Sequence, residues 1–263
     1  MTDAVALLGI CWEEGATGPR GAAAGPQAVR ERLFSDAGNG YAESGVAILD
    51  RLVDVGDPDL PLAEVAGRKA IEVAARDAAA VGAVLALGGD HSVTLPLMRA
   101  AATRHGPLHV LHFDAHPDLY PELDGRRYSH ASPFVRGLEE GLIERLVQVG
   151  IRANSPPQRE VVARYGDRVR QYGPADLAAI DGEFLGSPRY VTIDIDALDP
   201  AFAPGVAHPE AGGLTVRELV DVIRRLGGNW IAADLVEVVP ERDVAGLTAV
   251  AAAKVIKELI AVH

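Results

Sequence analysis

The chain has 263 residues, of which 48% are hydrophobic and 24% are charged, and its formal net charge is −12. This composition excludes a disordered or fibrous chain, and we expect one domain that spans residues 1–263. An acidic surface disfavours binding to nucleic acid or to an anionic membrane, so we expect neither as a partner.

The only cysteine, Cys11, follows an apolar segment, and we expect it to be a small buried hydrophobic residue rather than a nucleophile. A single cysteine can form no disulfide within the chain, which suits a reducing compartment. The first residues lack the basic stretch that opens a signal peptide, and no apolar run is long enough to span a membrane. We therefore expect a cytoplasmic protein.

Short β-branched segments alternate with alanine-rich segments of helical length. In chain order, we expect strands at 4–10, 49–55, 84–87, 108–113, 146–151, 190–195 and 230–239. We expect helices at 25–33, 62–81, 93–105, 157–165, 215–226 and 244–262, and the end of a helix at 137–142. Strands that are almost wholly apolar and alternate with helices are typical of a parallel sheet covered on both faces. The sequence therefore predicts an α/β fold, a single three-layer α/β/α domain with a mainly parallel sheet.

Polar side chains gather where the predicted strands end, at the edge where open α/β sheets bind ligands. One cluster is HFDAHPDLY, in which Asp114, His116 and Asp118 occupy alternate positions. In an extended segment these three side chains share one face. Three such groups leaving a buried strand are costly without a partner, and a divalent cation is the simplest partner they could share.

The segment TIDIDALDP repeats this pattern, because Asp194 and Asp196 lie on one face of a predicted strand. Two neighbouring carboxylates repel each other unless a cation lies between them. His91, in GGDHS, adds a second imidazole, whereas we expect Asp90 beside it to form local hydrogen bonds. Asp199 precedes a proline, and we expect it to cap a turn rather than to bind metal.

The metal-ligand candidates are two histidines and four aspartates: His91, Asp114, His116, Asp118, Asp194 and Asp196. Without a thiolate, this oxygen-rich set suits Mn²⁺ or a similar ion better than structural Zn²⁺. One catalytic ion that keeps an open coordination position needs fewer ligands than this set provides. We therefore expect two Mn²⁺ per chain and bridging carboxylates. Such a pair lowers the pKa of a shared water, which makes hydrolysis the natural reaction class.

Two further residues complete the predicted site. His130, in YSHASPF, follows the second cluster in a loop, where a histidine can act as a proton shuttle. Glu237 ends a buried strand, where a lone carboxylate is costly. Either a cationic ligand or an arginine of the protein, such as Arg242, would satisfy it.

The motifs GGDHS, DAHPD, SHASPF and TIDIDALDP, followed by DLVEVVPERD, resemble in kind and order those of the ureohydrolases, the family of arginase and agmatinase. The resemblance covers nearly the whole chain and is nearest to the plant-type arginases. It implies a three-layer α/β/α fold, an assembly of trimers or hexamers, and a hydrolase that releases urea and an amine from a guanidino substrate.

The resemblance also implies roles for the candidate residues. It divides the metal ligands among two Mn²⁺ ions: His91 and Asp118 on one, His116 and Asp196 on the other, Asp114 and Asp194 bridging. Glu237 would hold the guanidinium and His130 would shuttle a proton, so these two and Asp118 are the expected catalytic residues.

The part of the site that reads the far end of the substrate departs from the animal-type arginases. Here PELDGRRYSH replaces their Ser/Asn-rich stretch. The segment APGVAHPEAGGL, which contains His208, stands where many members of the family have a threonine. Arg126 or Arg127 could offer a cation to a substrate carboxylate, and both could equally be solvated loop charges. We expect L-arginine as substrate, with agmatine or another guanidino acid as the alternative, and we include His208 and His130 among the substrate contacts.

Other classes fit less well. A deacetylase-like enzyme would use one Zn²⁺ and fewer carboxylates, and a calcineurin-like phosphatase would need GDxxDR and GNH[DE] motifs, which this sequence lacks. A catalytically silent family member that senses a ligand would not need the complete set of ligands, His130 and Glu237.

Overall fold

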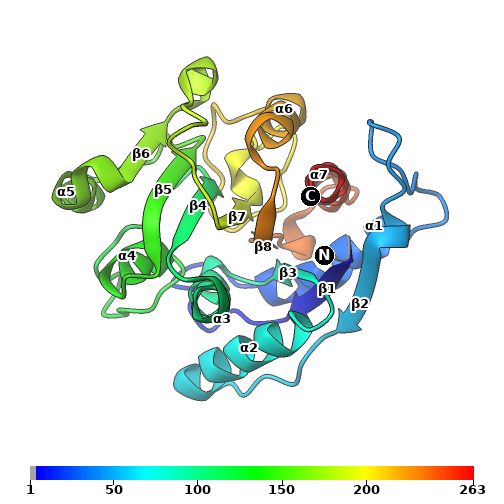
Figure 1. Cartoon of the computed structure of the whole chain (residues 1–263), viewed down its shortest axis with the longest axis horizontal. Coiled ribbons are helices and arrows are strands. Elements are labelled where there is room, and N and C mark those ends of the chain that lie inside the picture. Colours follow the sequence, from blue (N-terminus) through cyan, green and yellow to red (C-terminus); the bar gives the residue numbers. More distant parts are fainter. Residues whose placement is uncertain (1–3) are drawn as a thin grey trace.

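The computed structural model describes residues 4–263, so residues 1–3 of the predicted domain lie outside it. Within this range eight strands form one parallel sheet in the order β2-β1-β3-β8-β7-β4-β5-β6 (Figure 1). The strands are β1 (Val5–Ile10), β2 (Leu52–Gly56), β3 (Ala83–Gly88), β4 (Leu108–Phe113), β5 (Ile143–Val149), β6 (Val169–Tyr172), β7 (Arg189–Asp194) and β8 (Trp230–Val236).

Helices cover both faces of this sheet, as the sequence predicted. They are α1 (Gly25–Leu33), α2 (Glu64–Ala78), α3 (Thr94–His105), α4 (Pro133–Glu139), α5 (Pro156–Tyr165), α6 (Val216–Leu226) and α7 (Leu247–Ala261). Helices α1, α6 and α7 pack together on one face, and α2, α3 and α4 pack on the other (Figure 1).

Alternation along the strands builds the two cores. In β3, Leu85 and Leu87 pack with the layer of α1, α6 and α7, whereas Val84 and Ala86 pack with the layer of α2 and α3. Successive side chains of a strand point to opposite faces, so a strand covered on both sides must be apolar throughout. The predicted three-layer α/β/α architecture is confirmed.

The sheet order also explains how distant segments meet. The chain passes from β3 to β4 and later inserts β8 and β7 between them, so these four strands are neighbours in the order β3-β8-β7-β4. All are parallel, and their carboxyl ends therefore lie at one edge of the sheet. A change of direction in strand order at such an edge leaves a crevice for ligands.

Several predicted boundaries were wrong for local reasons. The helix end expected at 137–142 belongs to α4, which begins at Pro133 and ends at Glu139, just before Gly141, a residue with φ of 70°. Proline suits a first helical turn, and a positive φ ends the helix. The strand expected at 230–239 ends at Val236, because Glu237 has φ of 65° and leaves the extended conformation. The short edge strand β6 was missed, since VRQY is largely polar.

The expectation that Cys11 is buried was also wrong. β1 ends at Ile10, and Cys11 is exposed immediately after it, with its sulfur 3.8 Å from Asp57 Oδ2. The chain leaves the covered part of the sheet at this point. Among the described residues we find no helix with the length and apolar character needed to cross a membrane.

Candidate active site and metal centre

A cavity of about 360 Å³ opens at the carboxyl edge of the central strands. Its walls come from the segments that follow β1, β4, β7 and β8, together with the loops before α4, α5 and α6. The lining residues are Thr17, His116, Asp118, Tyr120, Leu123, His130, Ala131, Ala153, Ser155, Gln158, Asp194, Asp196, His208 and Glu237. Most of the predicted site residues therefore meet in one hollow.

His91 lies at the floor of this region, directly after β3, and is fully buried. Its Nδ1 atom faces three carboxylates, at 3.2 Å from Asp114 Oδ2, 3.0 Å from Asp118 Oδ2 and 3.4 Å from Asp194 Oδ2. One imidazole nitrogen thus points into a pocket of oxygens, which is the arrangement expected of a metal-binding histidine.

His116 forms a second group of the same kind. Its Nδ1 atom lies 3.4 Å from Asp114 Oδ1 and 3.1 Å from Asp196 Oδ2. Asp114 therefore offers one carboxylate oxygen to the His91 group and the other to the His116 group. This is the position that a bridging ligand between two ions would occupy.

The backbone brings these ligands together in a way that the alternation argument did not foresee. β4 ends at Phe113, and Asp118 has φ of 51°, so residues 114–118 form a tight loop rather than an extended segment. Asp194 ends β7 and caps a short 3-10 helix (Ile195–Ala197), where its Oδ1 accepts from Asp196 N at 2.9 Å. The predicted convergence is confirmed, whereas the predicted extended geometry was wrong.

The buried carboxylates raise the proton affinity of Asp194 and of the two imidazoles. Burial and the charges of Asp196 and Asp114 raise the pKa of Asp194 well above its ordinary value. Burial disfavours a charged His116, but its hydrogen bonds to Asp114 and Asp196 outweigh this and raise its pKa to about 12. Burial likewise opposes charge on His91, yet its three carboxylate neighbours raise its pKa well above 6.5.

This donor set fits divalent cations. Ligating atoms of Asp114, His116 and Asp196 lie within 4.8 Å of one another, and the buried His91 Nδ1 has no well-formed hydrogen bond in the described structure. So many buried carboxylates are costly without positive charge among them, and protons on the imidazoles supply it here. Cations placed between the same atoms would supply it without those protons.

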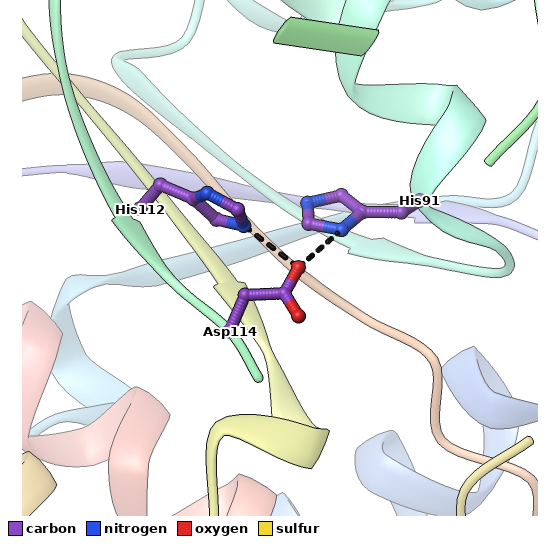
Figure 2. Close-up of side chains that lie close together, drawn as sticks. All are labelled: His91, His112 and Asp114. Carbon is purple, nitrogen blue, oxygen red and sulfur yellow. Dashed lines mark hydrogen bonds and ion pairs between the residues drawn. The ribbon is translucent and has the colours of Figure 1, made fainter. Parts of the chain in front are cut away.

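His112 belongs to this centre, although the sequence argument overlooked it. Its Nε2 donates to Asp114 Oδ2 at 2.8 Å (Figure 2). Gln148 Nε2 donates to its Nδ1 at 2.9 Å. These bonds set the tautomer of His112 and orient the carboxylate of Asp114. Its place two residues before Asp114, with the same alternation as His116, was the available signal.

Glu237 and His130 lie on the wall above the metal ligands. Glu237 Oε1 accepts from His91 N at 2.8 Å and lies 3.7 Å from His130 Nδ1. His130 Nε2 lies 3.0 Å from Thr17 Oγ1. Burial opposes charge on His130, but Glu237 outweighs it and raises the pKa of His130 to about 9. A proton held here faces the cavity.

The predicted contacts to the far end of a substrate divide into two groups. His208 lines the cavity, with its ring centre 5.1 Å from that of His130. The arginines take other partners: Arg126 Nη1 donates to Glu14 O at 2.7 Å, and Arg127 Nη2 donates to Glu139 Oε2 at 3.0 Å.

Three further residues had minor roles predicted from the sequence: Arg242, Asp90 and Asp199. Arg242 donates to Ala207 O at 3.2 Å rather than to Glu237. Asp90 accepts from Ser92 N at 2.9 Å, which confirms its local role. Asp199 accepts from three backbone N–H groups, including Gly212 N at 2.7 Å, which confirms it as a turn residue.

Comparisons with known proteins agree with this geometry. Residues 3–261 match the Arginase family. The arginase of Medicago truncatula, described as mitochondrial, is 38% identical over 272 residues, which are 97% of this chain and 80% of that protein. The guanidinopropionase of Pseudomonas aeruginosa is 39% identical over 273 residues, 97% of this chain and 85% of that protein.

Solved structures show the same likeness. An arginase structure from Medicago truncatula superposes with a TM-score of 0.89 at 36% identity, covering 99% of this chain and 87% of that one. The proclavaminate amidinohydrolase structure from Streptomyces clavuligerus has a TM-score of 0.88 at 34% identity, covering 98% and 90% of the two chains.

The chain belongs to the arginase family, the ureohydrolases that its motifs resemble, and its similarity to plant arginases is confirmed. It is an enzyme of the hydrolase class with the arginase-like α/β fold.

Proposed function

We propose that this enzyme hydrolyses a guanidino compound, with L-arginine as the favoured substrate, to urea and an amine, using two Mn²⁺ per chain. The observation that carries this proposal is the shared position of Asp114 between the His91 and His116 groups, beneath the paired Glu237 and His130.

The resemblance to the arginase family and the distances among these side chains support the proposed metal ligands. His91 and Asp118 would hold one ion, His116 and Asp196 the other, and Asp114 and Asp194 would lie between them. When bound, a pair of divalent ions acidifies water and so supplies a nucleophile near neutral pH. The oxygen-rich ligand set favours Mn²⁺ over softer metals.

The chain's own residues would bind the substrate and move the proton. The carboxylate of Glu237, buried at the strand end, would pair with the planar guanidinium through charge-assisted hydrogen bonds. Attack of water on the guanidinium carbon and loss of the amine require a proton on the leaving nitrogen. His130, whose pKa is raised to about 9, holds such a proton beside Glu237 at neutral pH.

L-arginine is favoured because several similar proteins, including those of Medicago truncatula and rice, are named arginase. Agmatine is the second candidate, and one observation favours it. In the described part of the chain, the residues that line the cavity include no arginine or lysine to pair with a carboxylate. His208 remains as the group that would contact the far end of either substrate.

We also propose a homo-oligomer, a trimer or hexamer, as the resemblance implied. Light scattering on the purified protein measures this mass directly. The proposed metal and substrate sites lie within one chain and do not depend on the outcome.

A panel of guanidino compounds tests the proposed reaction. The Mn²⁺-loaded enzyme should release urea from L-arginine with a higher kcat/KM than from agmatine, guanidinopropionate or guanidinobutyrate. Glu237→Gln should abolish turnover of every compound alike, whereas Glu160→Gln, on the exposed surface of α5, should leave it unchanged. Preference for agmatine would transfer the proposal to the second candidate, and no urea from any compound would indicate a silent ligand-binding protein.

A further inference from the structure

Another buried carboxylate, that of Asp234, lies behind the proposed metal ligands and has no role in the site as described above. Asp234 lies on β8 with no exposed surface. Three hydroxyls converge on it: Tyr190 Oη at 2.5 Å, Thr192 Oγ1 at 2.6 Å and Thr94 Oγ1 at 3.0 Å. A carboxylate can only accept, so each hydroxyl donates its proton to Asp234.

Thr192 connects this carboxylate to the metal centre. Its Oγ1 lies 3.0 Å from His91 Nε2. Because the hydroxyl has a single proton and donates it to Asp234, it can only accept from His91. Nε2 of His91 therefore carries a hydrogen, and Nδ1, which faces Asp114, Asp118 and Asp194, is the nitrogen whose lone pair a cation would bind in place of a proton.

The sheet holds this line of hydrogen bonds in place. Thr192 on β7 and Asp234 on β8 are directly paired residues of adjacent strands, and Ala86 of β3 pairs with Asp234 on its other side. His91 follows β3 by three residues. Three neighbouring strands thus position the acceptor, the connecting hydroxyl and the imidazole without any flexible loop.

We propose that Asp234, acting through Thr192, is a positioning residue for His91: it sets the tautomer and ring orientation that His91 needs to bind a divalent cation. This inference rests on the proposed function, because it assumes that His91 is a metal ligand. Groups that orient metal-binding histidines in this way typically affect metal affinity by about 10- to 100-fold when removed.

The alternative role for Asp234 is purely structural, as the acceptor that ties α3 to the sheet through Thr94. The two roles can be separated, because Thr94 and Thr192 donate to the same carboxylate but only Thr192 contacts His91. Thr94→Val is therefore a matched control for Thr192→Val. Both residues are fully buried, and both changes replace a hydroxyl by a methyl group at nearly constant volume.

The experiment is an Mn²⁺ titration of metal-free protein, with free Mn²⁺ measured by electron paramagnetic resonance. We expect Thr192→Val to weaken one of two binding steps by about 10- to 100-fold. Thr192→Ser, which keeps the hydroxyl, and Thr94→Val should both bind within about threefold of wild type. Asp234→Asn provides a second variant and should weaken the same step as Thr192→Val.

Thermal unfolding of each metal-free variant accompanies the titration, so a variant that fails to fold is recognised and the remaining variants decide. Equal affinity in wild type and Thr192→Val, or an equal loss in Thr94→Val, would overturn the positioning role while leaving the proposed function intact. Wild-type protein that binds no Mn²⁺ would overturn both.

Discussion

Asp114 connects the two halves of the proposed metal centre. Its two oxygens face different imidazoles, His91 and His116, and His112 donates to the oxygen that faces His91. The carboxylate is fully buried, so its orientation is set by these neighbours rather than by solvent. A residue held in this way can serve two cations at once without rearranging when they bind.

The metal-free protein should lose stability as the pH rises from about 7 to 10. The pKa of His130 is raised from 6.5 to about 9, so its stabilising effect is complete below 6.5 and is lost as the pH passes 9. Burial and the charge of Glu237 raise the pKa of Asp90 to about 7, so its destabilising ionisation takes place between about pH 3.8 and 7 and is largely complete where this window begins. His130 alone should account for a loss of about 2–3 kcal/mol. The raised pKa values of His91 and His116 add to the loss in the same direction.

Urea-induced unfolding in the presence of EDTA measures this change. The lowered pKa of buried His112 acts below pH 6.5 and so lies outside the window. His130→Asn should reduce the pH dependence by the share of His130 and leave the part due to His91 and His116, and Mn²⁺ should restore stability at high pH. Metal-free wild type that is equally stable at both ends of the range would show that Glu237 does not hold a proton on His130.

At the scale of the elements, the proposed active residues lie where strands end or in the loops just beyond, and two of them adopt an unusual backbone conformation. Asp118 and Glu237 have φ values of 51° and 65°, a left-handed conformation that is unfavourable for residues other than glycine. Such conformations persist where the surroundings enforce them, and they are concentrated at functional sites. Here they turn a carboxylate out of the strand direction and into the cavity.

A charged cluster joins the segment after α1 to α6 and α7. Glu258 of α7 is buried, bonds to Arg224 and Lys254, and accepts from Glu43 N at 2.9 Å. Burial opposes its charge, but these partners outweigh it and hold its pKa below 4.5. Its stabilising effect is therefore present above pH 4.5 and is lost as the pH falls below that value.

Glu258→Gln should lower the free energy of unfolding by about 1–3 kcal/mol at pH 7, with a smaller difference from wild type at pH 3. Chemical unfolding at both pH values provides the comparison. Glu160→Gln, at an exposed position on α5, should change stability by no more than about 0.5 kcal/mol. A loss for Glu258→Gln that is the same at pH 3 would mean that packing, not charge, accounts for it.

The sequence was sufficient to predict elements with a strong local signal. The helix expected at 215–226 is α6, which begins at the capping box of Thr215 and Glu218, and apolar strands between helices indicated the covered sheet. The convergence of His91 and Asp194 followed from the rule that parallel strands end at one edge. The left-handed turn at Glu237 could not be predicted, because it depends on contacts made after folding.

Residues that act through others were also beyond the sequence argument. The roles of His112 and Asp234 cannot be inferred before the neighbouring strands are known, because their partners Gln148 and Thr192 lie far from them in the sequence. The direction of Arg126 likewise depends on packing, because its acceptor is a backbone carbonyl near the N-terminal end of the chain.

For the whole molecule, the order of the strands in the sheet determines where the proposed site residues meet. Inserting β8 and β7 between β3 and β4 places the four segments that carry the proposed site residues side by side, although they span about 150 residues of the chain. The net charge of −12 adds a field that favours cations, both metal and guanidinium. The fold thus supplies a rigid, acidic crevice, and the loops around it would contact the far end of the substrate.

The most direct test is the rate of urea release from L-arginine as Mn²⁺ is added in known equivalents to the metal-free enzyme. Two ions sharing Asp114 and Asp194 predict that activity rises until two equivalents per chain are bound and then stays constant. Full activity at one equivalent, or urea release that is independent of added metal, would contradict the proposed binuclear site.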